Sequence, residues 1–524
     1  MTSKAKKYSL AVVFALLVLA LVSLSFWCAS LSRQVEGLYA ELNTYREKEG
    51  QSYVVERISK QMEDIAYQQK DISEKQREEA LYQMGVAQKM RARAEAEQRK
   101  AQEFARNVVE ARNMAEEQRE LAIDQQHRAE FARNVADTLS YVALGRALAM
   151  LSSIQYRADN KTASALLAYA SWKFTSMYKG DVYQPVLFDA LSQNSATFMS
   201  RNLHKGGVTR IVNDRNLPDH YVSVSDYGEV CRWQYVDGEI NHQLLFSDPA
   251  YSFRDVYVDA EGVVYALSYQ GELVVIANKE TPRKVVLPES RGWLRLAPMA
   301  EGQLLLLSSA NCYFYDIRER EITKTMPLPE HPTALTEKEG RWFVFGDGKG
   351  FWEIKPEGNL VPYERWISNT ITAAAWSPEL KLTAIGVKNG DIYVVNEVGN
   401  VVKKLVGHQS QVSQLGFKGQ HLFSSSYDRM VCLWDMKADR QEPVSLKSLS
   451  SWVYGFCLSG DNTIWVGDAS GSVSRIMVSP DEMAELIQKN LRRDFTEDEW
   501  NYYVGSNVPR IRMMKYIEQK ERKQ

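Results

Sequence analysis

The spacing of hydrophobic and polar residues changes several times along the chain, and the first segment is the most apolar. Residues 10–31 carry no charged side chain. As a helix this run would be about 33 Å long, which is enough to cross the hydrocarbon core of a bilayer. We therefore predict a membrane-spanning helix that begins at Leu10 and ends at Leu31, after a short basic tail at residues 1–9.

The alternative to a permanent anchor is a cleaved signal sequence. The apolar run is longer than the usual ~7–15 residues, and no small-x-small cleavage site closes it. Phe26 and Trp27 precede Cys28, where a lipoprotein signal would have small residues. Three lysines lie within the first seven residues, whereas the basic residues after the run are mixed with glutamates. This asymmetry favours a single-pass inner-membrane protein with a cytoplasmic N-terminus and the rest outside the cytoplasm.

Residues 32–138 are rich in Gln, Glu, Arg and Ala, with a seven-residue repeat. A small apolar residue returns at every seventh position from Ala80 to Ala143. This period predicts a long helical stalk and favours a coiled coil that could join copies of the chain. Because a seam lined by alanine buries little apolar area, a single solvated spacer helix stays open as the alternative.

Residues 139–195 have a different helical pattern, with apolar residues at three- and four-residue spacing. The pattern predicts helices over 139–155 and 163–177, a break at 179–181 and a third helix opened by Pro185. We expect these helices to form a collar that packs on the following domain. All fifteen prolines lie at or after Pro185, and proline breaks helix interiors. The chain therefore divides into a helical half and a mainly non-helical half.

From residue 196 short β-rich runs alternate with turns of Gly, Asp and Asn, at a period near 40 residues. Seven such turns predict a seven-bladed β-propeller over residues 196–479; a β-sandwich rarely shows seven units in register. The run at 195–203 is expected to supply the outer strand of the seventh blade and close the ring. Residues 480–524 are predicted to be a helical tail, with a charged, mobile end from Met513. The turns lie at 226–228, 270–271, 310–311, 347–350, 389–390, 428–429 and 470–471.

The repeat at 407–435 is the clearest of the seven. A Gly-His pair at 407–408 precedes a strand-like run, and a Trp-Asp pair at 434–435 ends the unit. This is the WD-repeat signature. The resemblance implies a buried relay of hydrogen bonds among His408, Ser424, Asp428 and Trp434, which would satisfy polar groups that are costly to bury alone.

The order of these segments resembles a module of large bacterial signalling proteins, the STAND-type NTPases and caspase-like conflict-system proteins. Their C-terminal WD-repeat array often follows a transmembrane helix and a coil. Three stretches carry the resemblance: the coil, the Leu/Ala-rich run at 163–170 and the run at 490–503, which contains Phe-Thr-Glu-Asp-Glu-Trp. No NTPase or protease precedes residue 10, so the resemblance implies that any such effector is a separate polypeptide.

Composition and charge narrow the function further. Lys and Arg (64) nearly balance Asp and Glu (66), so no overall field favours nucleic acid. The five cysteines form no CxxC pair, and Cys231, Cys312 and Cys432 are expected to be core thiols on equivalent strands. Unpaired cysteines mildly favour a reducing compartment. We give more weight to the three N-terminal lysines, which favour a propeller outside the cytoplasm.

The sequence contains no pattern typical of a catalytic or metal site. It has no HExxH motif and no His/Cys cluster, and the glycine-rich run at 346–350 lies in a blade turn without the following helix that a P-loop needs. We therefore predict no cofactor, no metal and no catalysis. The fold class that we expect is α plus all-β: membrane helix, coiled-coil stalk, helical collar and propeller.

Protein binding is the function that this architecture favours. Propellers present loops on one wide face, and aromatic and Arg side chains dominate protein interfaces. Trp452, directly before the first strand of the seventh blade, is the leading candidate, with packing between blades as its alternative. Tyr427 and Arg429 are further candidates. We predict a membrane-anchored scaffold or sensor at the cell envelope. The alternatives are a periplasmic propeller hydrolase and a cytoplasmic, membrane-tethered partner of a separate effector.

Overall fold

The computed structural model describes residues 108–514, except 279, 300–301, 349, 365–366 and 439–441, together with scattered positions among 23–32 and 73–90. Most of the predicted membrane helix at 10–31 and much of the stalk lie outside these residues. Where the structure describes the chain, no helix is both long and apolar enough to span a bilayer. The chain divides into two compact units, Met1–Ala136 and Asp137–Gln524.

The long helix α3 (Val108–Arg157) joins the predicted stalk to the predicted collar without a break. Its side chains at 118–137 are exposed on all sides, including the repeating alanines Ala122, Ala129 and Ala136. The structure of the single chain thus shows a solvated helix here and does not show the predicted coiled coil.

The collar contains α4 (Lys161–Met177) and α5 (Pro185–Ser195), close to the helices that the sequence predicted. Ser152 on α3 and Ser164 on α4 each donate to the backbone carbonyl of the other, at 2.8 and 2.9 Å. These reciprocal bonds satisfy two hydroxyl groups that are fully buried between the helices.

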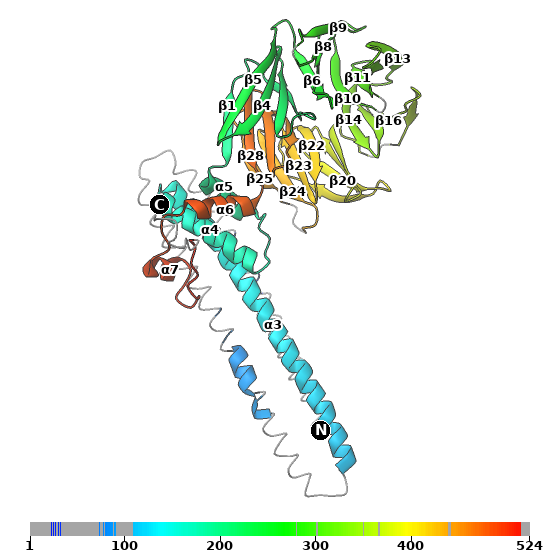
Figure 1. Ribbon diagram of the computed structural model, residues 1–524. Coiled ribbons are helices and arrows are strands. Elements are labelled where there is room, and N and C mark those ends of the chain that lie inside the picture. Colours follow the sequence, from blue (N-terminus) through cyan, green and yellow to red (C-terminus); the bar gives the residue numbers. More distant parts are fainter. Residues whose placement is uncertain are drawn as a thin grey trace. The chain divides into compact units, whose positions relative to one another are not determined.

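The rest of the second unit is a ring of seven four-stranded antiparallel sheets, which confirms the predicted seven-bladed β-propeller (Figure 1). Six sheets use four consecutive strands, and the strands run outward from the centre in chain order. Blades 1–3 contain β2 (Val208–Asn213), β3 (His220–Ser225), β4 (Glu229–Val236), β5 (Glu239–Ser247), β6 (Phe253–Val258), β7 (Val264–Ser268), β8 (Glu272–Ile276), β9 (Arg283–Val286), β10 (Trp293–Pro298), β11 (Gln303–Ser308), β12 (Asn311–Asp316) and β13 (Glu321–Pro327).

Blades 4–7 repeat this plan. They contain β14 (Pro332–Lys338), β15 (Arg341–Gly346), β16 (Phe351–Ile354), β17 (Leu360–Pro362), β18 (Ile371–Ser377), β19 (Leu382–Val387), β20 (Ile392–Asn396), β21 (Val401–Leu405), β22 (Val412–Lys418), β23 (His421–Ser426), β24 (Met430–Asp435), β25 (Val444–Ser448), β26 (Val453–Leu458), β27 (Thr463–Asp468) and β28 (Ser472–Met477).

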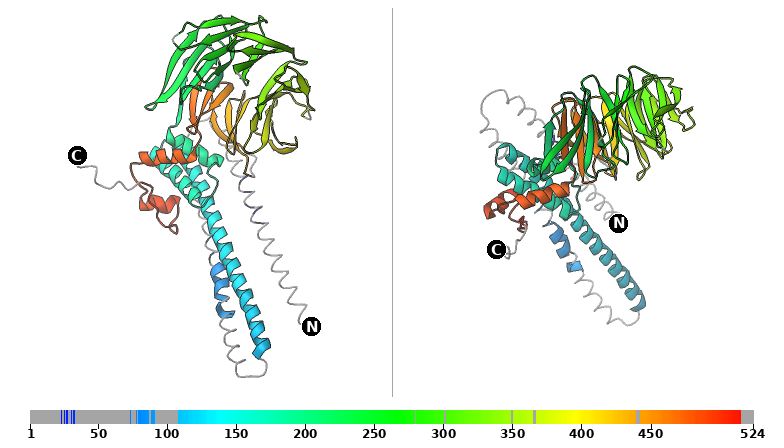
Figure 2. Two further views of the ribbon diagram at one scale, coloured as in Figure 1. Left: turned by 45° about the vertical axis from the view of Figure 1, so that its right-hand side comes forward. Right: turned by 45° about the horizontal axis from the view of Figure 1, so that its top comes forward.

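The seventh blade is completed by a strand from the other end of the domain. The strand β1 (Phe198–Asn202), which precedes the first blade, pairs antiparallel with β28 along its whole length. This closure was predicted from the run at 195–203 and is confirmed. The views in Figure 2 show the resulting ring of sheets. Closing the ring leaves each blade flanked by neighbours on both faces, which buries the apolar side chains between blades.

The innermost strand of every blade carries the same irregularity. In each of the seven, the register with the second strand shifts between the first and third residues, as in a β-bulge. The first residue packs in the core; Val208, Phe253 and Trp293 are fully buried. A bulge re-aims the residues beside it, and in blades 1–6 the residue at the third position lines the central channel, as described below.

The C-terminal tail packs against the collar and the last two blades. It forms α6 (Pro480–Asn490) and α7 (Glu497–Tyr503). Ser479 caps α6, and Thr496 with Glu499 forms a capping box on α7. The tail residues join one core with α4, α5 and the strands of blades 6 and 7.

The end of this tail corrects one expectation. Met513 was predicted to begin a mobile end, but it is fully buried. Its backbone carbonyl accepts a bond from Gln488 and its N–H donates to Asp494, at 2.9 and 3.1 Å. The charged residues of the segment suggested a solvated end. Instead, the buried side chain of Met513 and the two hydrogen bonds of its backbone hold this residue in the core. The residues after Met514 lie outside the described part.

The cysteines of the described chain are free and buried, as predicted for Cys231, Cys312 and Cys432 on β4, β12 and β24. Burial raises the pKa of the Cys231 thiol to about 12, and it raises the pKa of Cys312 and Cys432 as well. These thiols therefore stay protonated near neutral pH and act as small apolar core groups.

Candidate functional site

The structure brings His408, Ser424, Asp428 and Trp434 together in blade 6. Nδ1 of His408 lies 2.9 Å from the carboxylate of Asp428, and Nε2 lies 2.7 Å from the Ser424 hydroxyl. Nε1 of Trp434 donates to the same hydroxyl at 2.8 Å. With a neutral imidazole that donates from Nδ1, Ser424 donates to Nε2 and accepts from Trp434. Every polar group of the relay is then satisfied, so the relay fixes the strands of the blade.

Hydrogen bonds also set the acidity of the relay carboxylate. Burial alone would raise the pKa of Asp428. The hydrogen bond from His408 and those from the backbone N–H groups of Gln409 and Met430 outweigh this effect and hold the pKa below its ordinary value. Asp428 is therefore ionised at neutral pH and anchors the relay.

A second relay lies in blade 1 and was not recognised from the sequence. Nε2 of His204 lies 2.7 Å from the Ser223 hydroxyl, which also accepts from Nε1 of Trp233 at 2.6 Å. Nδ1 of His204 lies 3.2 Å from the carboxylate of Glu229. Both relays separate Ser from Trp by ten residues, which is a usable sequence signal. The pattern was obscured because the carboxylate comes from the start of a strand and is a Glu.

One face of the propeller carries the turns that contain the predicted binding residues. In each blade the innermost strand begins on the face where the second and third strands are joined. Backbone hydrogen bonds join the start of the innermost strand to this turn. For example, the N–H of Tyr427 donates to the carbonyl of Gln411 at 3.0 Å, and the N–H of Ala469 donates to the carbonyl of Trp452 at 2.8 Å. We call this the entry face.

Trp452 lies on the entry face, and its side chain is 54% exposed. Its ring stacks on that of Tyr427, with centroids 5.6 Å apart and planes at 10°. Tyr427 in turn contacts the ring of Tyr454 edge-on at 5.8 Å. We call these three residues the aromatic patch. Trp452 of blade 7 thus contacts a turn of blade 6 through one ring face, as the alternative of packing between blades expected, while about half of the residue stays exposed.

Arg429 is exposed in the same turn as Tyr427, and its backbone is unusual. Its φ is +74°, a left-handed conformation that costs a residue with a Cβ about 1–2 kcal/mol. The equivalent turns of blades 1, 2 and 7 have glycine with positive φ: Gly228, Gly271 and Gly471. A strained arginine where glycine would fit better is consistent with a role for its side chain on the entry face.

In the described part of the glycine-rich turn at 346–350, two backbone donors already have a partner. The backbone N–H groups of Gly348 and Gly350 donate to the carboxylate of Glu330, at 3.0 and 2.9 Å. The turn joins β15 to β16, with no helix after it. An internal carboxylate thus occupies the donors that a phosphate would need.

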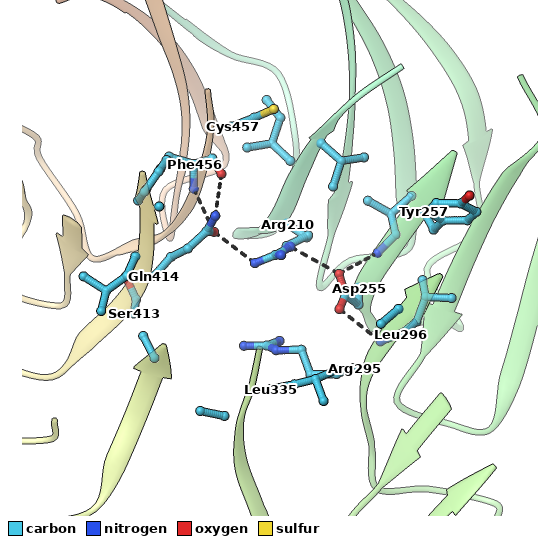
Figure 3. Close-up of a pocket in the computed structure, with 18 of the residues that line it drawn as sticks. Arg210, Asp255, Tyr257, Arg295, Leu296, Leu335, Ser413, Gln414, Phe456 and Cys457 are labelled. Carbon is cyan, nitrogen blue, oxygen red and sulfur yellow. Dashed lines mark hydrogen bonds and ion pairs between the residues drawn. The ribbon is translucent and has the colours of Figure 1, made fainter. Parts of the chain in front are cut away.

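A central channel with a cavity of about 430 Å³ runs between the innermost strands (Figure 3). Its walls carry a polar network that crosses four blades. Arg210 pairs with Asp255 at 3.3 Å and donates to Gln414 at 2.9 Å. The amide of Gln414 donates to the carbonyl of Phe456 and accepts from its N–H. The network therefore joins blade 2, blade 1, blade 6 and blade 7 across the closure of the ring.

A side chain at Gly455 would displace the amide of Gln414 from this network. A Cβ at this position would lie 2.5 Å from Oε1 of Gln414. Within the described residues, no group of three or more His, Cys, Asp or Glu side chains could hold a metal ion. The channel thus contains a structural ion pair, and its one lining carboxylate is engaged by Arg210.

Seven closed four-stranded blades and two Ser-His-Trp relays decide the architecture. The C-terminal part of this chain is a WD40-like seven-bladed β-propeller.

Comparison with known proteins gives distant similarities to this propeller. No protein-family model matches the chain. Meiotic fizzy-related protein 2 of Schizosaccharomyces pombe is 24% identical over 209 residues, which is 37% of this chain and 41% of that protein. The chain thus spans less than half the length of this relative. The crystal structure of the WD40 β-propeller domain of Doa1 aligns with a TM-score of 0.46 at 14% identity, over 54% of this chain and 96% of that one.

Acid is expected to destabilise the propeller through His204. Burial lowers the pKa of His204 below its ordinary value of about 6.5, although Glu229 acts in the opposite direction. Below about pH 6.5 the unfolded chain takes up a proton that the folded chain does not. The stability that depends on neutral His204 is therefore fully present above about pH 6.5 and is lost progressively as the pH falls below it.

The measurement is the urea midpoint of unfolding at about pH 7.5 and about pH 5.5, for the wild type and His204→Gln. We expect the wild-type midpoint to fall more on acidification than that of the variant. An equal fall in the two proteins would show that His204 does not couple folding to pH in this range.

Proposed function

We propose that this chain is a membrane-anchored scaffold or sensor at the cell envelope, which binds a protein partner through the entry face of its propeller and catalyses no reaction. The observation that carries the proposal is the aromatic patch, in which Trp452 is half-exposed and its ring stacks on that of Tyr427. An exposed aromatic ring held in one orientation can bury a large apolar area on binding, with little conformational entropy left to lose.

The neighbouring residues suit such a site. Arg429 is exposed in the turn that carries Tyr427, and Tyr227 is 46% exposed in the equivalent turn of blade 1. Tyrosine, tryptophan and arginine are the residues most enriched at binding hot spots. The entry face thus offers a group of anchors around the mouth of the channel.

The remaining parts of the proposal follow the sequence. Residues 10–31 would insert in the inner membrane, with residues 1–9 in the cytoplasm and the propeller in the periplasm. Residues 32–138 would form the stalk, residues 139–195 the collar, residues 196–479 the propeller and residues 480–524 the tail. Self-association through the stalk is supported by Phe131 and Val135, which lie one turn apart on α3 and are 71% and 40% exposed. A separate effector polypeptide of a bacterial signalling system is a further proposed partner.

Site-specific photo-crosslinking in cells tests the binding face. A crosslinking amino acid is placed at Tyr227 on the entry face, or at Glu379 on the opposite face, where β18 connects to β19. Both side chains are exposed. We expect a discrete protein adduct at position 227 that disappears when Trp452→Ala is added, and none at position 379. An adduct at position 379 alone, or one at 227 that persists with Trp452→Ala, would refute the proposed face.

A further inference from the structure

The central channel is asymmetric in a way that the repeat does not require. The third residue of each innermost strand, just after the bulge, lies at the same level of the ring. Three consecutive blades place charged residues there, whereas the other four place small or neutral ones. In blade order the seven residues are Arg210, Asp255, Arg295, Ala334, Ala373, Gln414 and Gly455.

The charges at this level do not balance. Asp255 forms an ion pair with Nε of Arg210 and accepts hydrogen bonds from the backbone N–H groups of Val256 and Leu296. It is therefore satisfied without Arg295. Among the residues that the structure describes, Arg295 forms no ion pair, and its Nη1 donates to the carbonyl of the adjacent Leu294 at 3.2 Å. One positive charge in the channel is left without a counter-charge.

The surroundings of Arg295 disfavour its charge. Burial lowers the pKa of its guanidinium, and the neighbouring cations Arg210 and Arg254 act in the same direction, while Asp255 and Tyr427 oppose them. Figure 3 shows the side chain of Arg295 extending into the cavity, on the same side as the guanidinium of Arg210. Burying a guanidinium without an anion costs free energy, and an anion bound from solution would reduce this cost.

The channel wall beside Arg295 offers space for an anion. Ala334 and Ala373, the next two residues around the ring, leave the space beside Arg295 unfilled by longer side chains. The hydroxyl groups of Thr333 and Thr372 are engaged with the backbone carbonyls of Phe345 and Val412. The space beside Arg295 is thus lined by methyl groups and by hydroxyl groups that already have hydrogen-bond partners.

We propose that the central channel is a binding site for a small oxyanion, which pairs with the guanidinium of Arg295 in the space beside Ala334 and Ala373. A guanidinium presents a planar fork of N–H donors that matches the two oxygens of a carboxylate or phosphate. The anion can be a free solute or an acidic side chain that a protein partner inserts from the entry face. Binding of a free solute does not depend on the aromatic patch, whereas binding of a partner's side chain rests on the proposed protein-binding function.

Isothermal titration calorimetry on the purified full chain tests the site, at constant ionic strength set with sodium chloride. The probes are inorganic phosphate, for a free solute, and N-acetyl-glutamate amide, for an acidic side chain, with the glutamine analogue as the neutral control. We expect saturable binding of at least one anion and none of the neutral analogue. Arg295→Gln is expected to weaken that binding about tenfold or more, because it removes a charge-assisted, bidentate contact.

Two further variants keep the test decisive. Arg291→Gln removes an exposed arginine from the loop before the same strand and should leave binding unchanged. Arg295→Lys keeps the charge but loses the fork, so it should weaken binding severalfold even if Arg295→Gln fails to fold. Phosphate binding would identify a free solute, and binding of the glutamate probe alone would identify a partner's side chain. No binding of either anion, or equal binding by the Arg295 variants, would overturn the proposal.

Discussion

Replacing Trp452 with alanine is expected to weaken binding of the protein partner by about thirtyfold or more. Truncation of a hot-spot aromatic residue costs about 2 kcal/mol or more of binding free energy, and each 1.4 kcal/mol is a factor of ten in Kd. Trp452 fits this class because its ring is half-exposed and held in place by Tyr427. The measurement is the Kd of the partner captured by crosslinking, by biolayer interferometry with the wild type and the variant.

A matched control separates the aromatic patch from exposed apolar surface in general. Val286 is 81% exposed on β9, the outer strand of blade 2, away from the patch. Val286→Ala should leave the Kd within about twofold, and Trp452→Ala should change the unfolding free energy little, because surface substitutions usually stay within about 0.5 kcal/mol. Equal Kd values for the wild type and Trp452→Ala would remove the aromatic patch from the binding site.

Replacing Ser424 with alanine is expected to lower the free energy of unfolding of the propeller by about 2–4 kcal/mol. The hydroxyl group bonds to both Nε2 of His408 and Nε1 of Trp434, and its loss leaves two buried ring nitrogens without partners. Each unsatisfied buried polar group costs about 1–3 kcal/mol. Urea unfolding followed by tryptophan fluorescence reports this loss, since ten of the twelve tryptophans follow residue 200.

Two substitutions calibrate this effect. Ser223→Ala breaks the second relay, in which the same hydroxyl geometry links His204 and Trp233, so it should cost a similar amount. Ser448→Ala removes an exposed hydroxyl from β25 of the same blade as Ser424 and should be nearly neutral. A Ser424→Ala midpoint equal to that of Ser448→Ala would show that the relay contributes nothing to stability.

The propeller could be predicted from sequence because its repeats depend on local backbone chemistry. Several turns between the second and third strands contain a glycine with positive φ, such as Gly228 and Gly271, and Gly, Asn and Asp recur in these turns at the blade period. Closure by β1 was predictable because a propeller cannot leave its last blade with three strands. The helices of the collar followed from apolar spacing and from Pro185, which begins α5.

The channel and part of the site could not be predicted, because their positions are set by the fold and not by a motif. Arg210, Asp255 and Arg295 are separated by about 40 residues each, and only the common bulge places them at one level. The relay of blade 1 was missed because Glu229 replaces the turn aspartate. The stacking of Trp452 on Tyr427 is a contact between neighbouring blades, for which the sequence of one repeat gives no signal.

Hydrogen–deuterium exchange of the full chain, with and without its crosslink-identified partner, tests the central claim most directly. If the partner binds the entry face, slower exchange is expected at 226–228, 427–429 and 452–454, and unchanged exchange at the turns of the opposite face at 237–238, 339–340 and 380–381. Protection of the opposite turns with no change at Trp452 and Tyr427 would contradict the account and move the binding site to the other face of the propeller.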